Sequence, residues 1–158
     1  MSKTLVVYYS AQGNTKDLAE KIAKNLEADL FEIKPAQEYT NEDLDWTDDE
    51  SRVCREHDGE SLRDVELETA EVPNWNEYDK VLIGYPIWWG IAAWPTSAFV
   101  HKQDFGGKTV VPFCCSHTSG LGNSDKLLGE GANGDWKPGI RFPMGTSDED
   151  NKNWTDSL

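Results

Sequence analysis

The fold is decided by the stretch Leu5-Val6-Val7-Tyr8-Tyr9-Ser10-Ala11-Gln12-Gly13-Asn14-Thr15. Its first half is a continuous run of β-branched and aromatic residues, which is typical of a strand buried on both faces. Its second half is a small polar turn. From Thr15 to Leu26 the apolar residues then recur with helical spacing and form one stripe. The stretch therefore predicts a buried strand, a tight turn and a helix in succession.

The same succession of strand and helix patterns continues along the chain. Further strands are predicted at Leu30–Ile33, Lys80–Tyr85, Thr109–Cys115 and, weakly, Ile140–Phe142. Helices are predicted from the Pro95 region through Val100, around Ser124–Leu128, and after Ser147 in a last short helix that carries Trp154. Strands separated by helices or loops indicate an α/β fold with a mainly parallel sheet and right-handed crossovers.

Three informative turns each follow a predicted strand. They are Ser10–Thr15, Pro86–Gly90 and Ser116–Gly122. The strand before the second turn is expected to end at Pro86. Because the carboxyl ends of parallel strands meet at one edge, we expect these turns to gather there. Open α/β sheets bind ligands at that edge, where the strand order reverses.

Length and composition limit the class of protein. The 158 residues suit a single domain over 1–158, and 37% hydrophobic with 11% aromatic residues predict a packed core. No apolar run approaches the ~20 residues that span a bilayer, and no signal peptide is evident. The three cysteines are odd in number and two are adjacent, so we expect a reducing, cytoplasmic location rather than a disulfide framework or a metal site.

The chain is strongly acidic. Fifteen basic and 29 acidic residues give a formal charge of −14, which disfavours nucleic acids and anionic membranes and favours partners with a basic docking face. The acids are concentrated in residues 36–76. We expect a solvated acidic loop there, over one sheet edge, with a short helix within Glu42–Glu56.

The first turn has the properties of an anion cradle. It opens a helix, whose N-terminal N–H groups and dipole attract negative charge. Ser10, Gln12, Asn14 and Thr15 add neutral donors, and the turn holds no Lys or Arg. An ordinary capped loop is the alternative. The motifs of P-loop nucleotidases, Rossmann dinucleotide sites and G-x-S-x-G hydrolases are absent, and the first strand does not end in the acids that a phospho-receiver needs.

The other two turns favour an aromatic, polar-edged ligand. Trp88 and Trp89 each offer a flat face that either packs in the core or stacks on a ring. Ser116–Gly122 offers backbone N–H groups and hydroxyls, and glycine there permits close backbone approach. His117 either polarises a bound ligand or lies on the loop surface.

Together these turns resemble the flavodoxin family. Ser10-Ala11-Gln12-Gly13-Asn14-Thr15 resembles the phosphate loop T-x-T-G-x-T, with Ser and Gln at its first two hydroxyl positions. Tyr85–Gly90 and Phe113–Ser124 resemble the P-I-W-W-G and F-x-T-x-G-G-S-G-x-G-x-S segments of a bacterial flavodoxin-like subfamily. Cys115 and Thr118 depart from the second pattern. The resemblance is weakest over 36–76 and 129–158.

The resemblance implies a flavodoxin-like three-layer sandwich with a five-stranded parallel sheet in order 2-1-3-4-5, and noncovalent FMN. The phosphate would be held by Ser10, Gln12, Gly13, Asn14 and Thr15. The flavin ring would be flanked by Pro86, Ile87, Trp88, Trp89 and Gly90. The ring's other side and polar edge would be met by Ser116, His117, Thr118, Ser119, Gly120, Leu121 and Gly122.

Two redox functions share such a pocket. One is electron transfer between redox partner proteins. The other is an FMN-dependent oxidoreductase that passes hydride from NAD(P)H to a quinone-type acceptor. Lys102 and Lys108 are the nearest candidates for an NADP phosphate, and no basic patch stands out near the three turns. This favours the carrier. A binding module without flavin is a third, weaker alternative.

Overall fold

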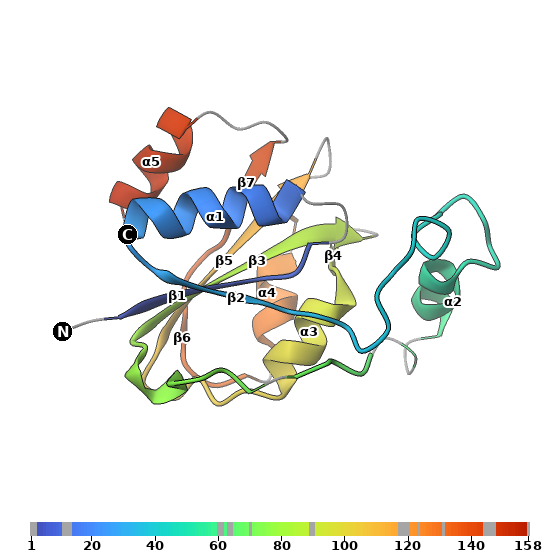
Figure 1. Ribbon diagram of the computed structural model, residues 1–158, viewed down its shortest axis with the longest axis horizontal. Helices are drawn as coiled ribbons and strands as arrows, with labels where there is room; N and C mark the ends of the chain where they lie inside the picture. The colour runs from blue at the N-terminus through green and yellow to red at the C-terminus, as the bar shows by residue number, and fades with distance from the viewer. Residues whose placement is uncertain are drawn as a thin grey trace.

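A mostly parallel sheet forms the centre of the molecule (Figure 1). The computed structural model describes residues 3–10, 14–59, 62, 65–69, 71–88, 91–116, 121–122, 124–130, 132–143 and 148–157. The strands are β1 (Thr4–Tyr8), β2 (Asp29–Glu32), β3 (Lys80–Trp88), β4 (Ile91–Ala92), β5 (Thr109–Ser116), β6 (Asp135–Trp136) and β7 (Ile140–Pro143). The helices are α1 (Asn14–Leu26), α2 (Arg52–Asp58), α3 (Trp94–His101), α4 (Ser124–Gly129) and α5 (Asp148–Asp156), with a 3-10 turn η2 (Trp75–Glu77).

The order of the predicted strands is confirmed, but the described residues form a sheet of seven strands rather than five, because the short strands β4 and β6 are added and β4 is antiparallel. The sheet runs β2-β1-β3-β5-β6, with β7 also paired to β5. Parallel register places Tyr8 opposite Gly84, and Gly84 opposite Phe113. A Cβ on Gly84 would lie 2.3 Å from the Phe113 ring, so the ring packs directly on the β3 backbone. This register brings the carboxyl ends of β1, β3 and β5 to the same edge.

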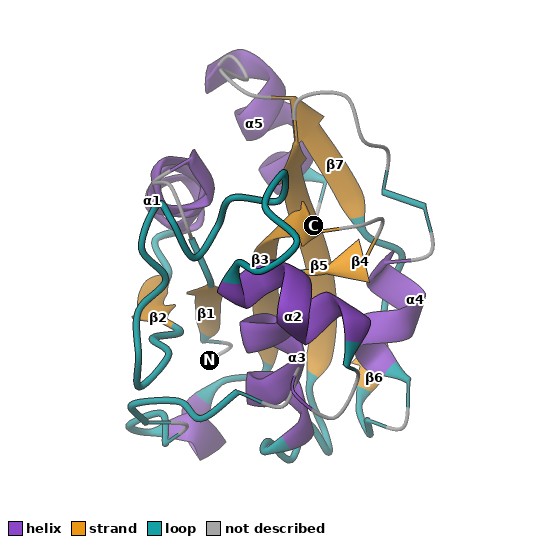
Figure 2. Cartoon of the chain, turned by 90° about the vertical axis from the view of Figure 1, so that its right-hand side faces the viewer, coloured by secondary structure: helices purple, strands orange, loops and turns teal. Residues whose placement is uncertain are grey.

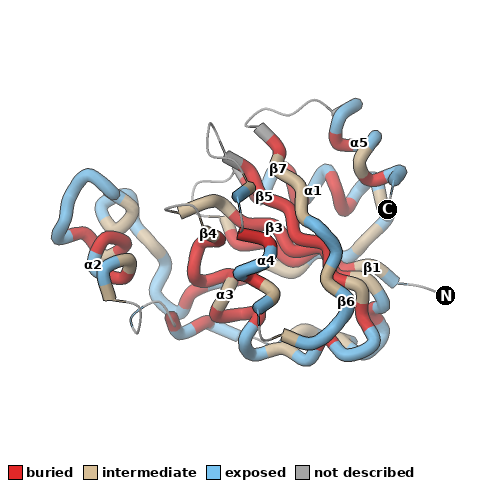
Figure 3. Tube along the Cα trace, turned by 180° about the vertical axis from the view of Figure 1, so that it is seen from behind, coloured by how far each residue is buried: buried red, intermediate tan, exposed pale blue. Residues whose placement is uncertain are grey.

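Two cores fill the two faces of the sheet. One lies under α1 and α5 and holds Val6, Leu82 and Phe113 together with Ile22 of α1. The other lies under α3 and α4 and includes Phe99. The alternation of side chains along each strand supplies both faces, and Figure 3 shows the buried strands between the helical layers. The result is the three-layer sandwich that was expected. No helix in the described part of the chain is both long and apolar enough to cross a bilayer.

The structure corrects two expectations about strands. The predicted end of the third strand at Pro86 is wrong, because β3 continues through Pro86 and Ile87 to Trp88. The extension is stabilised by pairing with β4 on one side and with Cys115 of β5 on the other. Between α4 and β7, where no strand is predicted from the sequence, the structure has β6, a two-residue strand that pairs with β5. Such short strands leave no periodic signal in the sequence.

The acidic segment is more ordered than the predicted solvated loop. It contains α2, whose N-cap Ser51 accepts a hydrogen bond from the Cys54 N–H at 3.4 Å. Val53, Cys54 and Glu56 are buried. A helix in this region was predicted, but its bounds are Arg52–Asp58 and not within Glu42–Glu56. Figure 2 shows α2 in front of the carboxyl edge of the sheet, and a hydrogen bond from Trp94 to Glu56 links it to the start of α3.

Candidate functional site

The first turn joins β1 to α1 at the carboxyl edge. Tyr9 is buried and its N–H donates to the Gly84 carbonyl at 3.0 Å, which fixes the chain just past β1. Helix α1 begins at Asn14, and Thr15 in its first turn is only 2% exposed. A buried hydroxyl at the N-terminus of a 13-residue helix is suited to an anion at that terminus. Gln12 and Gly13 lie outside the described residues, and Ser10 is half-buried.

The second turn begins inside an aromatic cluster. Trp88 ends β3 and is half-buried. Its ring centroid lies 4.8 Å from Trp94, 5.4 Å from Tyr39 and 5.7 Å from Tyr9, with interplanar angles of 73°, 72° and 89°. These edge-to-face contacts hold the indole by packing. Trp88 therefore packs partly against the core, and its stacking on a ligand stays a prediction. Pro86 and Ile87 precede it in β3; Trp89 and Gly90 lie outside the described residues.

The third turn leaves β5 at Ser116 and returns to α4. Gly122 has φ of 56°, a left-handed conformation that glycine adopts without strain. Ser124 Oγ donates to the Leu121 carbonyl at 2.7 Å and lies 3.0 Å from the Tyr85 hydroxyl. These bonds tie the end of the turn to β3. His117, Thr118, Ser119 and Gly120 lie outside the described residues, so their predicted roles stay predictions.

Sequence reasoning missed a buried carboxylate beside these turns. Glu56 of α2 accepts hydrogen bonds from the Trp94 indole at 3.0 Å, from the Arg52 guanidinium at 3.2 Å and from the Tyr39 hydroxyl. Burial, and then the hydrogen bond to Glu56, raise the pKa of Tyr39 well above its ordinary value. The only sequence signal is the i,i+4 spacing of Arg52 and Glu56 after a good N-cap. The two aromatic partners come from distant segments.

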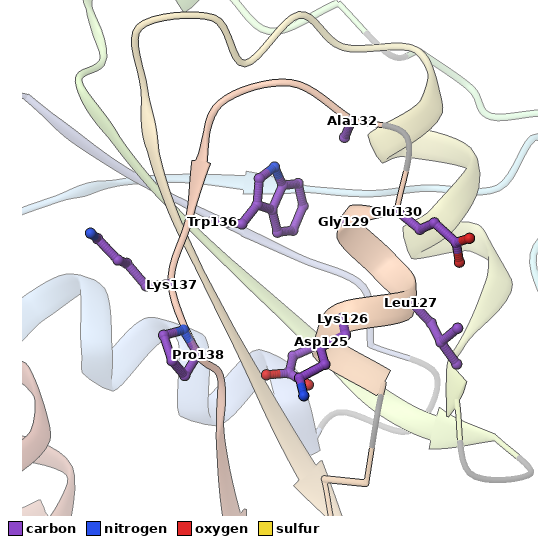
Figure 4. Close-up of a pocket in the computed structure, with 9 residues that line it drawn as sticks. All are labelled: Asp125, Lys126, Leu127, Gly129, Glu130, Ala132, Trp136, Lys137 and Pro138. Atoms are coloured by element: carbon purple, nitrogen blue, oxygen red, sulfur yellow. The ribbon is translucent and has the colours of Figure 1, made fainter.

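A hollow is lined by residues that lie outside the three turns. Figure 4 shows it between α4 and the chain around β6, with the Trp136 ring facing it and Leu127 and Lys137 at its margins. Its lining residues belong to 125–138. None of them was singled out by the sequence, and β6 pairs with the amino-terminal part of β5. None of the lining residues belongs to the three turns, and the hollow extends along α4 toward the amino-terminal part of β5.

Comparison with known proteins now decides the family. The family model described as flavodoxin matches residues 3–158. The chain belongs to the flavodoxin family. None of the curated protein sequences compared with this flavodoxin-family chain matches it significantly. The fold and the order of the strands agree with this assignment, and the resemblance read from the three turns is confirmed.

Solved structures of similar chains agree with the family. A candidate flavoprotein from Bacteroides eggerthii is 38% identical, with 100% of this chain and 98% of that chain covered and a TM-score of 0.89. A candidate flavoprotein from Bacteroides uniformis has the same identity and TM-score, with 98% of each chain covered. A flavoprotein from Lactobacillus acidophilus, solved in complex with FMN, is 25% identical with a TM-score of 0.71, covering 98% of this chain and 99% of that one.

The first turn of this flavodoxin-family protein generates a binding prediction. We expect the double variant Asn14→Ala, Thr15→Ala to bind FMN at least tenfold more weakly, since each lost hydrogen bond to a phosphate costs about 1.5–3 kcal/mol. Titration of the apoprotein, followed by flavin fluorescence, measures the affinity. Thr155→Ala is the control, because Thr155 is also a buried helical threonine but lies on α5. Equal affinities for wild type and double variant would contradict the phosphate assignment.

The Trp88 cluster generates a second prediction. If the exposed part of the Trp88 ring lies against a bound flavin, flavin emission should be strongly quenched in the wild-type complex. Trp88→Phe keeps an aromatic side chain but removes the readily oxidised indole, so emission should rise several-fold in steady-state and lifetime measurements. Trp75→Phe is the matched control, because Trp75 lies in η2 near the opposite edge of the sheet. Bright emission from the wild-type complex would contradict stacking on Trp88.

Proposed function

We propose that this flavodoxin-family chain binds FMN and transfers single electrons between partner proteins. The observation that carries the proposal is that β1, β3 and β5, which the three turns follow, end at the same edge of the sheet, in a chain that matches the family over residues 3–158. FMN combines a phosphate, an aromatic ring and a polar heterocycle edge. The FMN complex of the Lactobacillus acidophilus flavoprotein supports the same ligand.

The residues present fit a phosphate at the first turn. The described donors there are the N-terminal N–H groups of α1 and the buried Thr15 hydroxyl, and the first acid of the helix, Asp17, is exposed. Neutral donors and a helix dipole bind a phosphate without activating it for transfer. In this proposal Ser10, Gln12, Gly13, Asn14 and Thr15 hold the phosphate. A bound rather than reacting phosphate is what a resident cofactor requires.

The residues also fit the ring system. When bound, FMN supplies a carrier that accepts electrons one at a time. The protein's part is to hold the ring between the Pro86–Gly90 and Ser116–Gly122 turns and to exclude water from it. Trp88 is braced by three neighbouring rings, and the Tyr85–Ser124 contact fixes where the third turn re-enters α4. Both turns are thus anchored to β3. This anchoring limits the structural change of the turns when a bound flavin gains or loses an electron.

The negative charge of the protein is expected to lower the redox potential of a bound flavin. Each carboxylate ~10 Å away at an effective ε near 60 opposes added negative charge by roughly 0.5 kcal/mol, on the order of 20 mV. Salt screening reduces this value. With a formal charge of −14, several such contributions lower the potential. The same charge supports a partner with a basic docking face.

The two lysines considered for NADP do not lie at the candidate site. Lys108 is 7% exposed, and its ammonium donates to the carbonyls of Trp75 and Tyr78 at 2.9 and 2.7 Å. Lys102 follows the last residue of α3, shortly before β5 begins. Both are therefore near the amino edge of the sheet. Their placement favours the electron carrier over an NAD(P)H-dependent oxidoreductase.

A reductive titration tests the carrier directly. We expect two separate one-electron steps, with a radical signal in EPR between them, and no steady-state turnover of NADH or NADPH with a quinone. A single two-electron step combined with rapid NAD(P)H turnover would contradict the carrier and favour the reductase. Electron transfer to a basic partner should slow as ionic strength rises, because salt screens the attraction.

Two pairs of neutralising substitutions distinguish an effect of the acidic segment from an effect of the net charge of the protein. Glu38→Gln with Asp49→Asn should raise the lower of the two potentials by tens of millivolts and slow transfer to a basic partner. Asp43 and Asp48 are left intact, because each accepts a backbone hydrogen bond within its own turn. Asp79→Asn with Asp135→Asn removes the same charge from exposed positions at the amino edge. Equal effects of the two pairs would show that only net charge matters.

A further inference from the structure

The buried carboxylate of Glu56 joins three separate parts of the chain. Glu56 is 8% exposed, although it belongs to the acidic segment. One carboxylate oxygen accepts from the Trp94 indole at 3.0 Å and from the Tyr39 hydroxyl, and the other accepts from Arg52 Nε at 3.2 Å. Tyr39 follows β2, Trp94 opens α3 and Arg52 lies on α2. One side chain therefore connects two parts of the acidic segment, around Tyr39 and in α2, to Trp94 at the start of α3.

In the part of the chain that the structure describes, the two rings held by Glu56 are also the nearest ring neighbours of Trp88. The Trp94 and Tyr39 centroids lie 4.8 and 5.4 Å from that of Trp88, and both rings are close to perpendicular to it. Edge-to-face packing is directional, so the orientation of Trp88 depends on the orientation of these neighbours. Neither ring is held by packing alone, because each donates its polar hydrogen to the same carboxylate.

We propose that Glu56 is a positioning residue, which sets the place of Trp88 at the flavin ring by holding Tyr39 and Trp94. The proposal rests on the proposed function, in which Trp88 flanks FMN. It makes α2 part of the site, although none of its residues belongs to the three turns. It also gives the acidic segment a structural role besides its charge.

The chemistry of the cluster explains why the residue is a carboxylate. A buried carboxylate is costly unless it is paired and hydrogen-bonded, and Glu56 has both a guanidinium and two neutral donors. Arg52 also lies 3.9 Å above the Tyr39 ring and donates to the Gln37 carbonyl at 2.7 Å, so the cation is fixed as well. An apolar residue in place of Glu56 would leave the Trp94 and Tyr39 donors unsatisfied.

Glu56→Leu and Glu56→Gln are the test variants. Glu56→Leu removes every acceptor, whereas Glu56→Gln keeps one oxygen for Tyr39 and Trp94 and turns an amide toward Arg52. In the apoprotein, near-ultraviolet circular dichroism should show an altered tryptophan signal for Glu56→Leu and a smaller change for Glu56→Gln. In the FMN titration, Glu56→Leu should weaken binding roughly tenfold, as expected when fixed donors lose their acceptor, and Glu56→Gln should weaken it less.

A double-mutant cycle with Trp88 separates positioning from general stability. If Glu56 acts through Trp88, Glu56→Leu should cause no further loss of FMN affinity in a Trp88→Ala background. Tyr78→Phe is the matched control, because it removes another tyrosine-to-carboxylate bond, to Asp29 at 2.7 Å, at the amino edge of the sheet. It should leave FMN affinity and the tryptophan signal unchanged.

Several outcomes overturn the proposal. These are unchanged affinity and dichroism in folded Glu56→Leu, additive losses in the double variant, or an equal effect of Tyr78→Phe. If Glu56→Leu does not fold, Tyr39→Phe and Trp94→Phe each remove one donor and should each reproduce part of the loss, with unchanged affinity in both again overturning the proposal. Failure of the wild-type protein to bind FMN would overturn the proposed function as well, which distinguishes the two results.

Discussion

Parallel pairing of β1, β3 and β5 is the constraint on which the rest of the structure depends. Because the three strands run the same way, the segments that follow them start from one edge. Because Gly84 has no side chain, the Phe113 ring packs against the β3 backbone where the strands approach that edge. The helices then cover the two faces, and the edge is left to the connecting turns. The location of the site follows from strand direction before any site residue is considered.

The edge is completed by a segment that does not belong to the sheet. Helix α2 contributes no residue to the strands, yet its Glu56 contacts the aromatic cluster around Trp88. The Glu56 carboxylate is buried and forms an ion pair with Arg52. This pair lets a highly charged segment contact the core while most of the other acidic side chains of the segment remain exposed to water. In the proposed function, such a segment would support the aromatic residue beside the flavin and would also surround the site with negative charge.

The sequence predicted well those features that depend on local pattern. The apolar runs of β1, β3 and β5 and the stripe of α1 have clear periods, and the three turns carry recognisable chemistry. Extension of β3 through Pro86 was not predictable, because it depends on pairing with β4 and β5. The partners of Glu56 were equally hidden, since Tyr39 and Trp94 approach it only in the folded chain. Tertiary contacts between distant segments leave no periodicity.

The most direct measurement of the central claim is a map of backbone amide shifts when isotope-labelled apoprotein is titrated with FMN. If the strand ends form the site, the largest changes fall within Ser10–Thr15, Pro86–Gly90 and Ser116–Gly122, followed by smaller changes around Tyr39 and Glu56. Amides along β6 and beside the Trp136 hollow change little. Changes centred on Trp136 and Leu127, with the three turns unaffected, would contradict a flavin site at the carboxyl edge.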